Sequence, residues 1–173
     1  NPFENDNARN STVEDLPKQF VWTKTFGRLI SQKNHIVLGA RGSGKTAIVK
    51  MLSHEYLSKL DHPQAKQVIR SRKFVGIYVP MRLSWVGELK SSVWLTESEQ
   101  ELHFKWRLNV SCCASYLNTL RSCIDCYSGD IAERILTERA VAQKISKAWF
   151  EDDNIFTIRE LREKLSEIEY EKL

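Results

Sequence analysis

Gly39-Ala-Arg-Gly-Ser-Gly-Lys-Thr46 is the stretch on which the interpretation of this sequence depends. It matches the pattern G-x-x-x-x-G-K-[ST] at every defined position. Glycines at 39, 42 and 44 permit backbone conformations that a side chain forbids, and they leave room for phosphate oxygens. Successive backbone N–H groups can then converge on an anion, next to the start of a helix. The stretch is therefore predicted to be a phosphate-binding loop, which we call the P-loop.

The pattern also predicts what each residue does. Lys45 is the candidate catalytic residue because its ammonium group reaches the β- and γ-phosphates, and the Thr46 hydroxyl is the candidate Mg²⁺ ligand. The predicted nucleotide-binding residues are Gly39, Ala40, Arg41, Gly42, Ser43, Gly44, Lys45, Thr46 and Ala47. Arg41 occupies a variable position and is expected to pack or to face solvent. ATP and Mg²⁺ are the expected cofactors, since the N-K-x-D and D-x-x-G motifs of guanine-nucleotide proteins are absent from the sequence.

The residues on both sides of the P-loop predict an α/β fold. Apolar runs at 35–39 and 74–80 are typical of buried parallel strands, and the spacing of apolar residues predicts a helix from Gly44 to about Leu60. Strand, helix and strand form one βαβ unit over residues 33–82. We therefore expect a P-loop fold with a parallel sheet core and a large helical insertion after the second strand.

The other parts of the chain are predicted to be helical. Residues 1–32 are expected to form an arm and short helices near the nucleotide, with helices at 13–23 and 25–30. Residues 83–173 are expected to be a mainly helical region of the same domain, with long helices over 102–124 and 131–149. Thr157-Ile-Arg-Glu160 is a capping box that opens a last helix. The tryptophans expected in the core are Trp85, Trp94, Trp106 and Trp149.

Part of the chain resembles a known protein family. The residues that carry the resemblance are Asn1-Pro-Phe3, Asn7-Ala-Arg9 and the run Lys33-Asn-His-Ile-Val-Leu-Gly-Ala-Arg-Gly-Ser-Gly-Lys-Thr46. They resemble the opening of bacterial AAA+ ATPases of the origin-recognition and helicase-loader group, which overlaps with signal-transducing NTPases of antiphage defence. The resemblance implies that residues ahead of the P-loop close over the adenine, with Asn7 to Arg9 or Phe20 to Trp22 as candidates. A surface arm and an amphipathic helix are the alternative for these residues.

The sequence supports nucleotide binding more strongly than nucleotide hydrolysis. Hydrolysis in this class needs an acid after a second apolar strand to hold Mg²⁺, and Val79-Pro80-Met81 contains none. Asp125 follows an apolar residue, but it lies in helical periodicity and is expected at the surface. No sensor residue or arginine finger is identified. We expect weak or no turnover from this chain alone, and we expect the rest of the ATPase core to follow Leu173.

The expected function is to bind ATP with Mg²⁺ and to use the nucleotide state to control a larger assembly in bacterial antiphage defence. In the full-length protein this would include ATP hydrolysis. Other protein subunits, either further copies or an effector protein, are the expected partners. Two alternatives stay open, namely a small P-loop kinase and a non-hydrolysing nucleotide-gated interaction module. Phosphate release from ATP, with and without small-molecule acceptors, separates the three.

Composition restricts the location and the other ligands of the chain. The sequence contains no apolar run close to the roughly 20 residues that span a bilayer and no signal-peptide pattern, so we expect a cytoplasmic protein without membrane contact. The net charge of +4 does not by itself indicate nucleic acid. A basic cluster at Lys66, Arg70, Arg72 and Lys73 leaves a nucleic-acid contact open, beside a solvated connection between helix and strand.

Four cysteines lie within one predicted helical stretch, at Cys112, Cys113, Cys123 and Cys126. The last two have the C-x-x-C spacing of zinc and redox sites. A continuous helix offers no turn that could fold four thiolates around a metal. The sequence therefore favours reduced, metal-free cysteines buried on a helix face.

Overall fold

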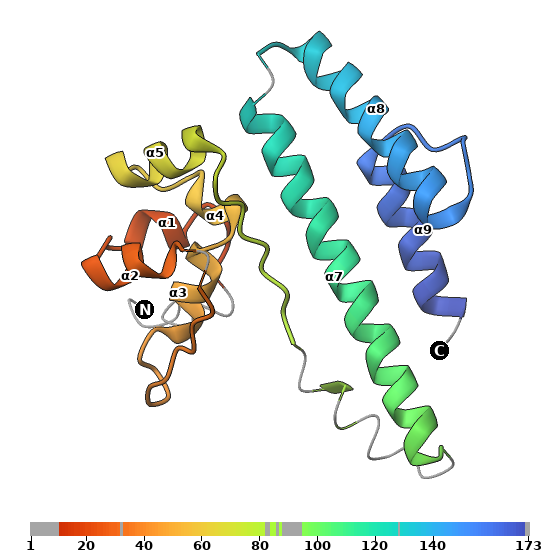
Figure 1. The fold of residues 1–173 in the computed structure, drawn as a ribbon, viewed down its shortest axis with the longest axis horizontal. Coiled ribbons are helices and arrows are strands. Elements are labelled where there is room, and N and C mark those ends of the chain that lie inside the picture. Colours follow the sequence, from red (N-terminus) through yellow and green to blue (C-terminus); the bar gives the residue numbers. More distant parts are fainter. Residues whose placement is uncertain are drawn as a thin grey trace. The chain divides into compact units, whose positions relative to one another are not determined.

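The computed structural model describes residues 11–31, 33–81, 84, 85, 87, 95–127 and 129–171. All regular structure in these ranges is helical, and the chain divides into two compact units, Asn1–Tyr78 and Val79–Leu173. We call them the N-terminal unit and the C-terminal unit. Figure 1 shows short helices in the first unit and long ones in the second.

The N-terminal unit contains short helices packed around an apolar core. The helices are α1 (Leu16–Gln19), α2 (Lys24–Leu29), α3 (Lys45–Met51), α4 (His54–Leu57) and α5 (Pro63–Ser71). Phe26, Met51 and Leu57 are each at most 1% exposed and form the centre of this core. The predicted helix at 25–30 corresponds to α2, whereas the one predicted at 13–23 is reduced to the four residues of α1.

The predicted parallel sheet is wrong. The two runs expected as strands, 35–39 and 74–80, are present but belong to no strand among the described residues. A strand is stabilised by hydrogen bonds and side-chain packing with a neighbouring strand, and these runs lack both. Ile36 and Leu38 are each 86% exposed, and the Gly76 carbonyl accepts its bond from the His54 N–H, at 2.9 Å. The expected βαβ unit is therefore absent from the described residues.

The helix predicted from Gly44 to about Leu60 is broken into two. Helix α3 ends at Met51, and α4 begins at His54. At the break, both the N–H and the hydroxyl of Ser53 donate to the Lys50 carbonyl, at 2.9 and 2.8 Å. The next N–H, that of His54, leaves the helical pattern and donates to Gly76. The segment after α5 is thereby tied to the junction between α3 and α4.

The basic cluster expected in a solvated connection instead lies on and just after helix α5. Pro63 occupies the first turn of this helix, where its missing N–H costs nothing. The side chain of His62 caps this helix by accepting from the Gln64 N–H at 3.3 Å. Arg72 ends it in a left-handed conformation, with φ of 52°.

The C-terminal unit is formed by three long helices, and the sequence predicted them well. They are α7 (Glu97–Tyr127), α8 (Ile131–Phe150) and α9 (Ile158–Glu171), which lie side by side in Figure 1. Leu117, Ala142 and Leu161, one from each helix, are fully buried in the shared core. The capping box is confirmed, since Thr157 and Glu160 each accept the other's backbone N–H, at 3.1 and 3.0 Å.

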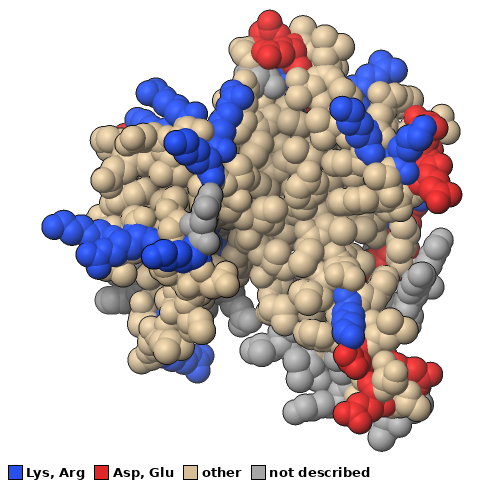
Figure 2. All heavy atoms as spheres, viewed as in Figure 1, with Lys and Arg blue, Asp and Glu red and all other residues tan. Residues whose placement is uncertain are grey.

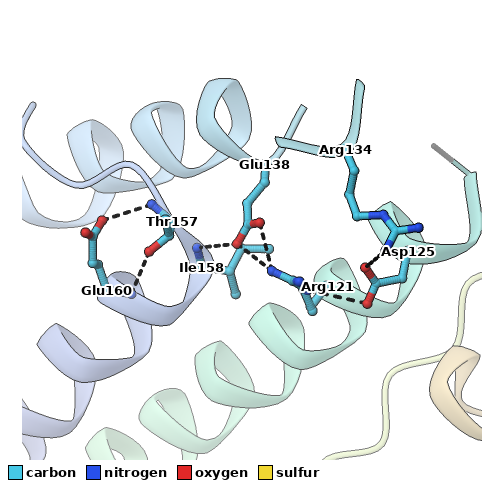
Figure 3. A network of polar contacts seen from close by, with 7 residues as sticks. All are labelled: Arg121, Asp125, Arg134, Glu138, Thr157, Ile158 and Glu160. Carbon is cyan, nitrogen blue, oxygen red and sulfur yellow. Dashed lines mark hydrogen bonds and ion pairs between the residues drawn. The ribbon is translucent and has the colours of Figure 1, made fainter. Parts of the chain in front are cut away.

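A polar network joins the three helices of the C-terminal unit (Figure 3). Both carboxylate oxygens of Glu138 accept from Nη1 of Arg121 at 2.8 Å, and Oε1 also accepts from the Ile158 N–H at 3.1 Å. Asp125 forms ion pairs with Arg121 and Arg134, both at 3.4 Å. Glu138 on α8 therefore contacts α7 and the first residue of α9.

Two of the tryptophan predictions agree with the structure. Trp85 is 7% exposed, and Trp106 packs against the core of the C-terminal unit. Trp149 is 37% exposed and packs edge to face with Phe150, so it lies at the margin of that core. Trp94 lies outside the described residues.

Candidate functional site

The P-loop follows residues 34–38, which have no regular secondary structure, and leads into helix α3. Gly42 and Gly44 have φ angles of 84° and 79°, in the left-handed region that L side chains rarely adopt. A Cβ atom at either position would meet no atom within 4 Å. Glycine is thus required there by backbone conformation and not by lack of space.

Gly39 lies close to the Ser43 side chain. A Cβ atom at this position would lie 2.6 Å from Oγ of Ser43, too close without a shift of one of the two residues. The Ser43 N–H in turn donates to the Ala40 carbonyl at 3.3 Å, which closes the turn. The first five residues of the P-loop therefore form a tight turn in which residue 39 lies close to residue 43.

The Lys45 side chain folds back over the loop that precedes it. Its ammonium nitrogen donates to the carbonyl oxygens of Gly39 and Ala40, both at 2.6 Å, and lies 3.4 Å from Oγ of Ser43. No acid among the described residues forms an ion pair with it. The positive charge is therefore held over the P-loop by backbone carbonyls, which an anion's oxygens can replace.

The other P-loop side chains are open to solvent. Ala40, Arg41 and Thr46 are exposed, and Ala47 is half-buried. Neither the Arg41 guanidinium nor the Thr46 hydroxyl makes a hydrogen bond or an ion pair with a described residue, and the exposed Arg41 side chain faces solvent. The Thr46 hydroxyl is free to bind a ligand.

The core of the N-terminal unit holds the far end of helix α3. Met51 is fully buried, and the ammonium group of Lys50 donates to the Ser11 carbonyl at 3.3 Å while lying 5.6 Å from the centre of the Tyr56 ring. Burial lowers the pKa of Lys50 below its usual value. His54, 1% exposed, follows on α4, and burial lowers its pKa as well. The P-loop thus projects from an anchored helix.

Comparison with known proteins identifies the family. A family model described as ORC-CDC6-like matches residues 1–172. The chain belongs to the ORC-CDC6-like family. This membership confirms the relation to origin-recognition AAA+ ATPases and supports a nucleotide-binding function of that class. No curated protein and no solved structure matches the chain significantly.

The candidates for adenine contact in the ORC-CDC6-like chain have different outcomes. Asn7 to Arg9 lie outside the described residues. Phe20 and Trp22 pack edge to face on Phe26, with ring centres 4.7 and 5.0 Å away, and Trp22 also stacks on His62. The two aromatic side chains therefore contribute to the core of the N-terminal unit, and their contact with adenine stays a prediction.

Asp125 and the cysteines belong to the C-terminal unit of the ORC-CDC6-like chain, whereas the P-loop belongs to the N-terminal unit. Asp125 is on α7 in ion pairs with two arginines, as a structural carboxylate would be. Cys113 and Cys123 are half-buried, and burial raises the pKa of Cys123 to about 11, whereas Cys112 and Cys126 are exposed. The expectation that all four are buried is thus wrong for two. In the described ranges no three His, Cys, Asp or Glu side chains come together as metal ligands.

Basic side chains collect on the N-terminal unit of the ORC-CDC6-like chain. Residues 11–78 contain 12 Lys and Arg against 4 Asp and Glu. Figure 2 shows many of these cations on one face of the unit. Among the cluster singled out from the sequence, Lys66 forms an ion pair with Asp61. None of the helices described in either unit is long and apolar enough to cross a membrane.

Sequence reasoning did not find the contacts that shape the P-loop. The pattern places Lys45 near phosphates but does not say which groups hold the ammonium nitrogen when no nucleotide is bound. The bond between the His54 N–H and the Gly76 carbonyl was missed because it joins residues far apart in the sequence. The glycine at 76 was a usable signal, since a Cβ atom there would overlap the Leu52 carbonyl oxygen.

Proposed function

We propose that this ORC-CDC6-like chain binds ATP with Mg²⁺ through residues 39–47. The observation that carries the proposal is the position of Lys45, whose ammonium nitrogen lies 2.6 Å from the carbonyl oxygens of Gly39 and Ala40. Oxygens of the β- and γ-phosphates would replace these carbonyls as its acceptors. The exposed Thr46 hydroxyl, next in sequence, supplies a Mg²⁺ ligand beside them.

The consequence of binding, in our proposal, is control of a larger assembly by the nucleotide state. Left-handed glycines and an exposed loop allow the P-loop to rearrange when Lys45 exchanges carbonyls for phosphates. Family membership supports this class of function, since it relates the chain to AAA+ ATPases. The resemblance to signal-transducing NTPases makes bacterial antiphage defence the setting we propose, with protein subunits as partners.

The substitution Lys45→Ala tests the nucleotide site. It removes the ammonium group that pairs with the phosphates, and we expect ATP affinity to fall by at least ~1.5–3 kcal/mol, the range of a charge-assisted hydrogen bond. Isothermal titration calorimetry with ATP and excess Mg²⁺ measures the change.

Lys73→Ala is the matched control for Lys45→Ala. It removes the same charge from the same unit, at an exposed position outside the P-loop. Its ATP affinity should stay close to that of the unchanged chain, which separates a local contact from a general loss of positive potential. Equal ATP affinities for Lys45→Ala and Lys73→Ala would contradict the assignment of the loop.

A further inference from the structure

A cavity outside the P-loop lies in the N-terminal unit, between helices α2 and α5. Its volume is about 550 Å³, within the roughly 300–1,000 Å³ typical of small-molecule sites. The residues that line it are Trp22, Lys24, Gly27, Arg28, Ile30, Gln64, Gln67 and Val68. None of them belongs to the P-loop. We call this space the α2–α5 cavity.

The polar walls of the cavity carry hydrogen-bond donors from both helices. Lys24 and Arg28 are four residues apart and so lie on one face of α2, while Gln64 and Gln67 are three apart on α5. None of these four side chains makes a hydrogen bond or an ion pair with a described residue. Two cations and two amides, all four exposed to solvent, therefore line one shared space without a described hydrogen-bond partner.

No acid lines the cavity to balance the two cations. Three of the four acids in residues 11–78 pair with other lysines, namely Glu14 with Lys59, Asp15 with Lys18 and Asp61 with Lys66. The unit as a whole carries an excess of positive charge, visible on the face shown in Figure 2. The uncompensated cations favour an anionic ligand.

The floor of the cavity is apolar and firmly held. The Trp22 indole lies parallel to the His62 ring, with ring centres 4.9 Å apart, and at 85° to the Phe26 ring. On Gly27, a Cβ atom would come within 3.4 Å of Nε1 of Trp22, so the glycine backbone packs close to the indole edge. Ile30 and Val68 add apolar surface. A ligand that fills this space needs an apolar body as well as a charge.

We infer that the α2–α5 cavity binds a small organic phosphate. Its phosphate group pairs with Lys24 and Arg28, because a guanidinium group and an ammonium group match two or three phosphate oxygens. Its apolar or planar body lies against Trp22, Ile30 and Val68. The glutamine amides on α5 donate to the remaining oxygens. The ligand therefore joins α2 to α5 and contacts no residue of the P-loop.

Phenyl phosphate is a suitable probe because it combines a phosphate ester with one planar ring. Two-dimensional NMR of the ¹⁵N-labelled chain records the indole N–H signals of its five tryptophans, and Trp22→Phe identifies the signal of Trp22. We expect phenyl phosphate to shift this signal saturably. Affinity should exceed that for inorganic phosphate or phenol by at least about tenfold, since each lacks one half of the ligand.

Three variants make the test specific. Arg28→Gln should weaken phenyl phosphate by at least about tenfold, whereas Lys73→Gln, an equal charge change outside the cavity, should not. Lys45→Ala should also leave the affinity unchanged, so that failure of the P-loop proposal and failure of this one are distinguishable. The backbone amide signals of residues 11–78 in the same spectra show whether the N-terminal unit of each variant is folded.

Several results would overturn the inference. One is a Trp22 signal that phenyl phosphate leaves unmoved, and another is binding of phenyl phosphate to Arg28→Gln as tightly as to the unchanged chain. Equal affinity for inorganic phosphate would show that the apolar floor has no role. A further titration with a 12-nucleotide DNA, single-stranded or duplex, distinguishes binding of a small phosphate ester from binding of a nucleic-acid backbone. A Trp22 shift with DNA but none with phenyl phosphate contradicts a small-molecule site.

Discussion

The Thr46 hydroxyl is the P-loop group through which we expect the metal to act. Thr46→Val keeps the shape of the side chain and removes the oxygen that would coordinate Mg²⁺. We expect this variant to lose most of the gain in ATP affinity that Mg²⁺ provides, with ATP affinity in EDTA little changed. Calorimetric titrations with Mg²⁺ and with EDTA give the two values.

Thr46→Ser is the matched control, since it restores an oxygen at the same position. Its Mg²⁺ dependence should resemble that of the unchanged chain. If Thr46→Val shows the same Mg²⁺ dependence as Thr46→Ser, the metal is held by other groups.

His54 should make the stability of the N-terminal unit depend on pH. Its side chain is 1% exposed, and burial lowers its pKa below the usual 6.5. When the pH falls below about 6.5, His54 therefore becomes protonated in the unfolded chain while it stays neutral in the folded chain. The stability contribution of neutral His54 is present above that pH. It is lost as the pH falls toward the folded pKa, by up to about 1.4 kcal/mol per pH unit.

Denaturation in urea at pH 7.5 and 5.5 measures this effect. His54→Gln cannot titrate, so its free energy of unfolding should change less between the two pH values than that of the unchanged chain. For each protein, the free energy of unfolding at pH 5.5 is subtracted from that at pH 7.5. This difference does not depend on any stability that the substitution itself removes. Parallel pH dependences in the two proteins would exclude His54 as the cause.

Glu138 is expected to hold the start of helix α9 in place. Its side chain is 12% exposed, and it accepts bonds from Arg121 and from the buried N–H of Ile158 (Figure 3). Glu138→Ala leaves that N–H without an acceptor, so we expect a loss of about 1–3 kcal/mol in the free energy of unfolding. Urea denaturation followed by circular dichroism measures it.

Glu163→Ala provides the contrast for Glu138→Ala. Glu163 pairs with Arg159 on the exposed surface of α9, where both side chains are more than half exposed. Removing it should cost no more than about 0.5 kcal/mol. Equal losses for the two variants would show that the Glu138 contacts add nothing beyond an ordinary surface pair.

The helices of the C-terminal unit were predictable because their signals are local. Apolar residues recur at helical spacing along α7 and α8, and the Thr157 and Glu160 capping box needs only four consecutive residues. The observed ends of α7 and α8 lie within a few residues of the predicted ones. Glu138 could not be found in this way, since its partners lie 17 and 20 residues away.

The strands next to the P-loop were not predictable, because an apolar run does not say what will cover it. Residues 35–39 and 74–80 read as buried strands, yet Ile36 and Leu38 are 86% exposed in the described structure. Sheet formation depends on partners elsewhere in the chain, whereas the glycine angles of the P-loop depend on the loop itself. The local conformation of the P-loop could therefore be predicted from the sequence, whereas the structure around it could not.

The P-loop and the long helices belong to separate hydrophobic cores. The core around Met51 lies within the N-terminal unit, and the core around Leu161 lies within the C-terminal unit; the two share no buried residue among those described. ATP binding in our proposal needs only groups of the first. The ion pairs of Asp125 on α7 stabilise contacts within the second. Nucleotide affinity and the stability of the helices should thus respond to different substitutions.

Our last prediction is that this chain alone binds ATP but releases phosphate at a rate close to background. Turnover needs an acid that holds Mg²⁺ and orients water, together with a cation that stabilises the transferring phosphoryl group, and such an arginine alone contributes roughly 10³–10⁵ in rate. No described acid contacts Lys45 or Thr46. Three acids of residues 11–78 form described ion pairs, and each of them pairs with a lysine outside the P-loop.

The measurement is phosphate release under single- and multiple-turnover conditions, beside saturable ATP binding by calorimetry. Lys45→Ala is the control, because it removes P-loop function while leaving any contaminating ATPase in the preparation unchanged. We expect equal, near-background rates for the two proteins, although only the unchanged chain binds ATP. A Lys45-dependent turnover of order one per second would contradict the prediction. It would mean that a catalytic acid reaches the P-loop from this chain itself, and substitution of each acid in turn would then locate it.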